Sequence, residues 1–194
     1  MIINPRDNIV PSFINLHMRC LLFSVLVLVG FQCFAQGLKL KECVIIAQFE
    51  KLEDRYALEV NLCEILNPMK IQTIPATNIV KQGGTALQLS SDSSMLSWKA
   101  KNIQTYCVVS VKGYDKKFKS SKSDISFKDA LERATLYSLY KADISSVTFE
   151  FLFFREGKVV YSDLLKIGNI GERDDVVKRF RKKAPKHIAE HWLN

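Results

Sequence analysis

Two histidines near the end of the chain have a spacing that could bind a metal ion. His187 and His191 flank Glu190 in the pattern H-x-x-E-H, which places both imidazoles and a carboxylate base on one helix, as in inverted zinc proteases. Such a site needs a third protein ligand, and only three residues follow His191. We therefore interpret the motif as two surface histidines on a helix end and predict no metal and no cofactor.

Basic side chains gather just before this motif, on the predicted helix face opposite its apolar stripe: Lys178, Arg179, Arg181, Lys182, Lys183 and Lys186. Such a cluster can bind anionic lipid head groups or polymers, and it can equally be a solvated helix face. The segment 113–124 contains a second group, Lys116, Lys117, Lys119 and Lys122, interleaved with Tyr114 and Phe118. The same two interpretations hold there.

Enzyme signatures are missing from the sequence. Gln82-Gly83-Gly84-Thr85 lacks the Gly-Lys-Ser/Thr ending of a phosphate-binding loop, and no G-x-S-x-G elbow occurs. The acidic pairs Glu53-Asp54 and Asp174-Asp175 stand where helix N-termini favour negative charge, which explains them without catalysis. We predict a protein that is not an enzyme.

Three cysteines lie beyond the N-terminal segment 1–35, which contains the apolar run Leu21–Gly30. Cys43, Cys63 and Cys107 each have apolar neighbours and form no C-x-x-C pair, so a zinc ribbon or a thioredoxin-like site is not supported. The first interpretation is three small buried side chains. The second is a disulfide between Cys43 and Cys107 on neighbouring strands.

The first half of the chain alternates between strand and helix patterns. Apolar runs predict strands over 42–49 and 105–111, and an extended segment over 70–80 contains Pro75, which suits an edge strand. Helical spacing predicts a helix over 52–66 that ends at Asn67-Pro68, and a second over 91–101 with Ser91 or Asp92 as cap and Met95, Leu96 and Trp98 as apolar surface. This order predicts parallel β-α-β-α-β pairing.

A turn is predicted in the first half, at Gln82-Gly83-Gly84. The second half begins with a polar loop over 113–124. Ser126 and Asp129 form a capping box for a helix through about Tyr140. A strand with alternating Phe149, Phe151 and Phe153 turns at Glu156-Gly157 into a hairpin partner over 158–165. A final helix from about Asp174 has an apolar stripe of Val177, Phe180, Ala184, Ile188 and Trp192. Pro185 predicts a kink or two shorter helices there.

These elements predict an α/β fold in two or three layers. Its mixed sheet has a βαβαβ front half, an antiparallel β-hairpin and a C-terminal helix. The chain of 194 residues has 47% hydrophobic and 25% charged residues, which suits one globular domain after removal of a leader. The net charge of +8 favours loose attraction to anionic surfaces without identifying one.

The front of the chain carries the pattern of an export signal. Arg19 precedes the apolar run Leu21–Gly30, and small residues favour cleavage after Ala35. We predict a signal peptide over 18–35 that begins at Met18, an upstream extension over 1–17 from a misplaced start, and one domain over 36–194. A retained membrane anchor is the alternative, while Gln32 before Cys33 argues against lipidation. The predicted location is periplasmic or extracellular.

The order of the elements resembles that of a group of small bacterial envelope proteins. The resemblance rests on a helix with Arg55, Glu59 and Leu62, on the step Pro75-Ala76-Thr77, on a later Gly157-Lys158 turn between strands, and on a terminal helix. These proteins share the fold of the N-terminal domain of TolB, of the curli-secretion lipoprotein CsgG and of the lipoprotein activators of penicillin-binding proteins. The resemblance implies partner binding in the envelope and supplies no catalytic residues.

We therefore expect a periplasmic accessory or scaffold protein that binds another envelope protein. The alternative is a protein that binds anionic lipid or an envelope polymer through the basic terminal helix. Export argues against nucleic acid as a partner.

Overall fold

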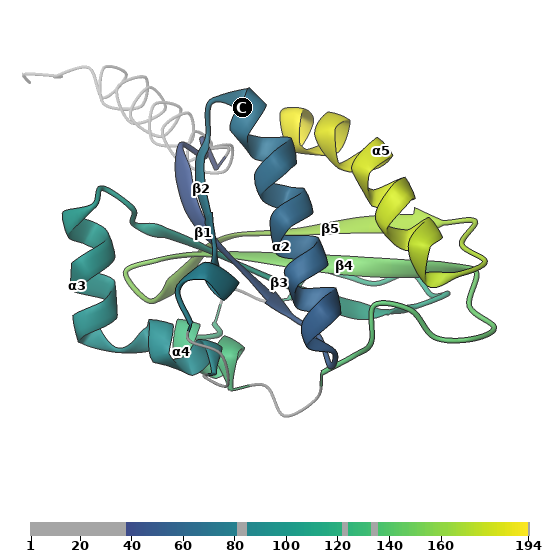
Figure 1. Ribbon diagram of the computed structural model, residues 1–194, viewed down its shortest axis with the longest axis horizontal. Helices are drawn as coiled ribbons and strands as arrows, with labels where there is room; N and C mark the ends of the chain where they lie inside the picture. Colours follow the sequence, from purple (N-terminus) through teal and green to yellow (C-terminus); the bar gives the residue numbers. More distant parts are fainter. Residues whose placement is uncertain (1–37, 81–84, 122–123, 133–135, 194) are drawn as a thin grey trace, which may run out of the picture. The chain divides into compact units, whose positions relative to one another are not determined.

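A mixed five-stranded sheet forms the centre of the fold, with strand order β2-β1-β3-β4-β5 (Figure 1). Its strands are β1 Glu42–Gln48, β2 Gln72–Pro75, β3 Thr105–Tyr114, β4 Ser146–Arg155 and β5 Lys158–Gly168. Both β2 and β3 run parallel to β1, whereas β3, β4 and β5 are joined antiparallel. The predicted fold class, with its parallel front half and its hairpin, is confirmed.

The computed structural model describes residues 38–80, 85–121, 124–132 and 136–193. The predicted upstream extension, the signal peptide and the turn at Gln82-Gly83-Gly84 lie outside these residues. Gly37–Asn194 form one compact unit. Among the helices in the described ranges, none has the length and apolar character needed to cross a bilayer.

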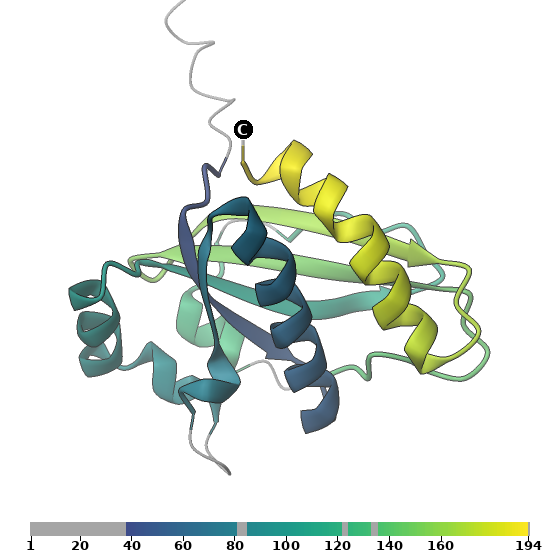
Figure 2. The same cartoon turned by 45° about the horizontal axis from the view of Figure 1, so that its top comes forward.

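Helices cover both faces of the sheet and make three layers. On one face α2 Leu52–Leu66 and α5 Arg173–His191 lie side by side in both views (Figures 1 and 2). The opposite face is covered by the short helical turn η4 Ala86–Ser90, by α3 Asp92–Ala100 and by α4 Phe127–Leu131. Alternate side chains of each strand therefore enter two separate apolar cores.

Strand β4 is buried on both faces because other segments cover both faces of the sheet there. Phe149, Phe151 and Phe153 are fully buried against α2 and α5, as predicted. The residues between them do not face solvent: Glu150 is 0% exposed and Leu152 is 1% exposed. The hairpin turn forms at Glu156-Gly157, where φ is 51° and 76°, and two consecutive positive φ values suit the twist of a two-residue hairpin loop.

Side-chain caps begin α3 and α4, whereas α2 begins without one. Helix α2 has the predicted bounds, and Pro68 limits it because proline cannot supply the next helical N–H. The Ser91 hydroxyl caps α3 by accepting from the Ser94 amide, but Leu96 is 66% exposed and does not contribute to the core. Trp98 alone of the three predicted apolar residues is buried there.

Two predicted extents are wrong. The extended segment 70–80 pairs only over Gln72–Pro75 and then forms the turn η3 Ala76–Asn78, because Pro75 ends the ladder. The helix that Ser126 caps ends at Leu131 instead of about Tyr140. After this helix the chain hydrogen-bonds to the segment that follows β1: the Tyr137 carbonyl accepts from the Glu50 amide at 3.3 Å. Tertiary hydrogen bonds replace helical ones in that segment.

Helix α5 is one continuous helix of 19 residues with Pro185 inside it, so of the two predicted alternatives, a kink or two shorter helices, the second is wrong. Its packing against the sheet is sufficient to hold the turn that lacks the proline N–H. The buried stripe begins with Val176, which is 0% exposed, and not with Val177. Its other members, Phe180, Ala184, Ile188 and Trp192, are buried as predicted.

The three cysteines beyond the leader are free and buried, which confirms the first of the two interpretations. The strand register places Ile45, and not Cys43, opposite Cys107. Burial raises the pKa of Cys43 and of Cys63 above the ordinary thiol value, as expected for thiols inside an apolar core.

Candidate functional site

A cavity of about 620 Å³ lies beside the carboxyl ends of β1 and β2. From β1 the chain passes to α2 on one face of the sheet, whereas from β2 it passes to η4 and α3 on the other face. Where successive connections leave an open sheet in opposite directions, a crevice remains outside the strand ends. The cavity lies where these two connections diverge.

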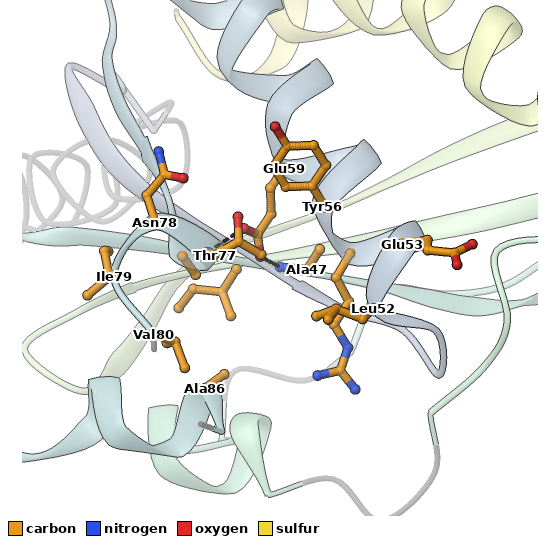
Figure 3. Close-up of a pocket in the computed structure, with 13 residues that line it drawn as sticks. Ala47, Leu52, Glu53, Tyr56, Glu59, Thr77, Asn78, Ile79, Val80 and Ala86 are labelled. Carbon is orange, nitrogen blue, oxygen red and sulfur yellow. Dashed lines mark hydrogen bonds between the residues drawn. The ribbon is translucent and has the colours of Figure 1, made fainter. Parts of the chain in front are cut away.

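Its walls come from four segments (Figure 3). They are one face of α2, the end of β1, the chain that follows β2, and the first residue of η4. Most of the wall is apolar. Its members are Ile46, Ala47, Leu52, Glu53, Arg55, Tyr56, Glu59, Ala76, Thr77, Asn78, Ile79, Val80 and Ala86.

Glu59 connects two segments of the cavity wall by hydrogen bonds. Its side chain is 2% exposed, and its two oxygens accept from the amides of Ala47 at 2.9 Å and Thr77 at 2.8 Å, both drawn in Figure 3. Burial raises the pKa of the Glu59 carboxyl above its ordinary value, although the two amides favour the charged form. One side chain of α2 thus fixes the end of β1 and the turn after β2.

Arg55 lies one turn before Glu59 on the same helix. Its Nε donates to the carbonyl of Phe49 at 2.6 Å, which anchors the guanidinium at the end of β1. Its two terminal nitrogens make no hydrogen bond or ion pair to another described residue. Because a guanidinium carries five N–H donors, the cavity wall contains an anchored cation with donors to spare.

Two large apolar side chains stand at the edge of the cavity. Leu52 is 62% exposed and Tyr56 is 56% exposed, and their spacing of four residues puts them on one face of α2. Among the described wall residues there is no cysteine or histidine. This arrangement provides apolar contact and hydrogen bonding, which suits binding.

The predicted basic cluster is divided by the tertiary structure. Arg181 pairs with Glu64 at 2.5 Å, Lys186 pairs with Glu190 at 3.8 Å, and the Lys183 ammonium donates to the Lys166 carbonyl at 3.3 Å. Arg179 is half-buried, and its Nε is buried without a hydrogen bond to a described residue. Only Lys178 and Lys182 are exposed and free of a partner within the described part of the chain. An anionic-surface site here stays a prediction.

The H-x-x-E-H segment is tied to the sheet. The carboxylate of Asp163 on β5 bonds both His187 Nε2 and Trp192 Nε1 at 2.7 Å. His187 is therefore not the surface residue that the sequence predicted, with a side chain only 17% exposed, whereas His191 is exposed. Burial alone would raise the pKa of Asp163, but the bonds from His187 and Trp192 outweigh it and lower the pKa. No residues in the described ranges are grouped as metal ligands.

The basic loop after β3 crosses the other face of the sheet. Buried Glu150 accepts from the Lys112 ammonium at 2.9 Å and from the Ser121 amide at 2.8 Å, and the Phe118 ring lies against Gly113. Lys116, Lys117 and Lys119 are exposed, while Lys122 lies outside the described residues. Buried Glu150 is thus an anchor of this loop.

Sequence reasoning missed the cavity although it had singled out several of its residues. Arg55, Glu59 and Pro75-Ala76-Thr77 carried the family resemblance, but nothing in the sequence indicates that Glu59 and Thr77 meet. One signal was available: Glu59 lies beside Leu58 and Leu62 on the predicted helix. A carboxylate on an apolar helix face needs hydrogen-bond donors from another segment.

No protein-family model and no curated protein matches this chain. Two solved structures are similar over most of their length. A lipoprotein of Neisseria meningitidis, GNA1162, is 11% identical with a TM-score of 0.43, and the match covers 77% of this chain and 99% of that one. A PelC dodecamer from Paraburkholderia phytofirmans is 12% identical with a TM-score of 0.41, and the match covers 78% of this chain and 90% of that one.

Proposed function

We propose that this chain is a non-enzymatic accessory protein of the bacterial cell envelope that acts by binding another protein. The export pattern over 18–35 supports the location. The observation that carries the binding role is the exposed apolar pair of α2, Leu52 and Tyr56, at the edge of the cavity.

The exposed pair continues the apolar wall of the cavity. Both side chains are more than half exposed, they are adjacent on one helix face, and the apolar cavity wall continues from them. Contiguous apolar surface next to a concavity is typical of protein–protein contact sites. A partner that covers this pair would bury an aromatic anchor of the type that dominates binding energy.

The state of the buried carboxylates also supports a binding role over catalysis. Asp54 pairs with Arg173 at 2.6 Å, Glu150 pairs with Lys112 at 2.9 Å, and Glu59 accepts two backbone amides. These groups hold separate segments of the fold in place. Catalytic acids and bases instead keep a proton site directed at substrate.

Site-specific photo-crosslinking in the bacterium that makes the protein tests the proposal. A benzoylphenylalanine in place of Tyr56 should give one discrete adduct with a second protein, identified by mass spectrometry. The matched control replaces Val160, which is 47% exposed on β5 at the far edge of the sheet. An absence of adduct at position 56, or the same adducts at both positions, would overturn the proposal.

A further inference from the structure

The cavity at the ends of β1 and β2 has the size and lining of a small-molecule site. Its volume of about 620 Å³ lies within the range of roughly 300–1,000 Å³ that is common for such sites. The second cavity, about 420 Å³ between α3 and the start of β3, has exposed Leu96 and Lys99 in its wall and no anchored cation. This second cavity is the control site in the experiment that tests the inference.

The apolar part of the lining predicts the body of a ligand. Ile46 reaches the cavity from the sheet, while Ile79, Val80 and Ala86 come from the connection after β2. Ile79, Val80 and Ala86 are only partly buried by the protein itself. A ligand with an aliphatic or aromatic body would complete the burial of these side chains.

Arg55 predicts a charged group on that ligand. Its guanidinium is half-buried and is held by the bond from Nε to the Phe49 carbonyl, so little side-chain freedom would be lost on binding. The terminal nitrogens are free among the described residues, and a planar guanidinium is suited to a carboxylate or sulfonate.

Two acidic residues share the wall, and neither accepts a hydrogen bond from these donors, although the charges of Arg55 and Glu59 attract each other. Glu59 uses both of its oxygens on the amides of Ala47 and Thr77. Glu53 is exposed in the first turn of α2, where solvent screens its charge.

We infer that this cavity binds a small ligand that has an apolar or aromatic body and one anionic group, and that Arg55 binds the anionic group. The inference does not depend on the proposed protein partner, although Leu52 and Tyr56 belong to the same wall. A ligand in the cavity would lie directly behind the surface offered to the partner. A bound ligand would then change the surface that the protein partner contacts.

Fluorescence titration of the purified protein with two probes tests the inference. Anilinonaphthalene sulfonate and phenylnaphthylamine share an aromatic body, and only the first has a negative charge. The protein should bind one equivalent of the sulfonate, about tenfold more tightly than the neutral probe, because a hydrogen-bonded charge pair contributes at least this much.

Three variants locate the binding. Arg55→Gln should reduce the affinity for the sulfonate about tenfold, to that of the neutral probe. Ala86→Trp should abolish binding of both probes by filling the cavity. Lys99→Gln removes a positive charge from the wall of the second cavity and should change neither affinity.

The inference is overturned if Arg55→Gln leaves the preference for the sulfonate intact, or if Lys99→Gln weakens binding as much. Thermal unfolding of each variant checks that it is folded. If Arg55→Gln does not fold, Arg55→Lys takes its place. The lysine keeps the positive charge, so this variant should still prefer the sulfonate, and Ala86→Trp should still abolish binding of both probes. The experiment uses the protein alone, so its failure is distinct from a failure to crosslink a partner at Tyr56.

Discussion

Asp54 at the start of α2 and Arg173 at the start of α5 form a charge pair beneath the two helices. The carboxylate is 2% exposed and Arg173 Nη2 lies 2.6 Å from its Oδ1, with Nε at 2.7 Å. Asp54 Oδ2 also accepts from the amide of Leu139 at 3.4 Å. One carboxylate thus joins two helices and the segment before β4, far apart in sequence.

Removal of Arg173 should therefore be costly. Arg173→Met leaves a buried carboxylate without its cation, and we expect a loss of about 2–4 kcal/mol in the free energy of unfolding, measured in urea. Lys186→Met is the matched control on the same helix, because Lys186 and Glu190 are 83% and 55% exposed and such pairs contribute up to about 1 kcal/mol. Equal losses for the two variants would contradict this role of Asp54.

Glu59→Gln should loosen the ends of β1 and β2. The amide side chain offers one acceptor where the amides of Ala47 and Thr77 need two, so we expect a loss of about 1–3 kcal/mol in unfolding free energy. Hydrogen exchange should show faster exchange of the Thr77 amide. Glu53→Gln, at an exposed position of the same helix, should change neither measurement.

The pH dependence of the Glu59 contribution has a definite sign. The pKa of Glu59 in the folded protein is raised from the ordinary value of 4.5, so the folded state binds the proton more tightly than the unfolded state. The stability of the native protein relative to Glu59→Gln should fall as the pH rises from 4.5 through the raised value. A difference that grows over this range would show that the pKa is not raised.

Asp163→Asn should show the opposite pH dependence. The pKa of Asp163 is lowered from 3.8, so its contribution is present above that value and is lost as the pH falls through the lowered pKa. At neutral pH we expect a loss of about 1–3 kcal/mol, since His187 and Trp192 lose a shared charged acceptor. Asp174→Asn is the control, with a side chain that is 85% exposed.

Gly113 and Phe118 should behave as a coupled pair. A Cβ at Gly113 would lie 2.3 Å from the Phe118 ring, and the φ of Gly113 is +156°. Gly113→Ala should cost about 1–3 kcal/mol, and Phe118→Ala in the same chain should restore part of that loss. A double-mutant cycle in urea measures the coupling, and strictly additive losses would contradict the contact.

Any attraction of α5 to anionic surfaces should depend on Lys178 and Lys182. These are the exposed members of the basic cluster that have no partner within the described ranges. Replacement of both by Gln should remove most salt-sensitive retention on vesicles that contain phosphatidylglycerol. Replacement of Arg181 and Lys186, which pair with Glu64 and Glu190, should remove less. Retention that persists at high salt would exclude a mainly electrostatic contact.

Local signals in the sequence were sufficient for most elements. Leu58, Leu62, Ile65 and Leu66 share a helical spacing that Pro68 ends, and α2 has the bounds that this spacing predicts. Ser91 and Ser126 each cap the helix expected after them. Where no local signal ended a segment, the prediction failed, as in the helix extended to Tyr140.

The sequence by itself determined the order of strands and helices, because apolar periodicity, caps and prolines act over a few neighbouring residues. The tertiary structure alone decided which side chains form the site. Glu59 meets the amide of Thr77, 18 residues away, and Asp54 meets Arg173, 119 residues away. Such contacts depend on how parallel strands and their crossing helices pack, and a polar residue carries no mark of its distant partner. The cavity lies where the connections after β1 and β2 leave the sheet on opposite faces, a tertiary arrangement that no local sequence pattern indicates.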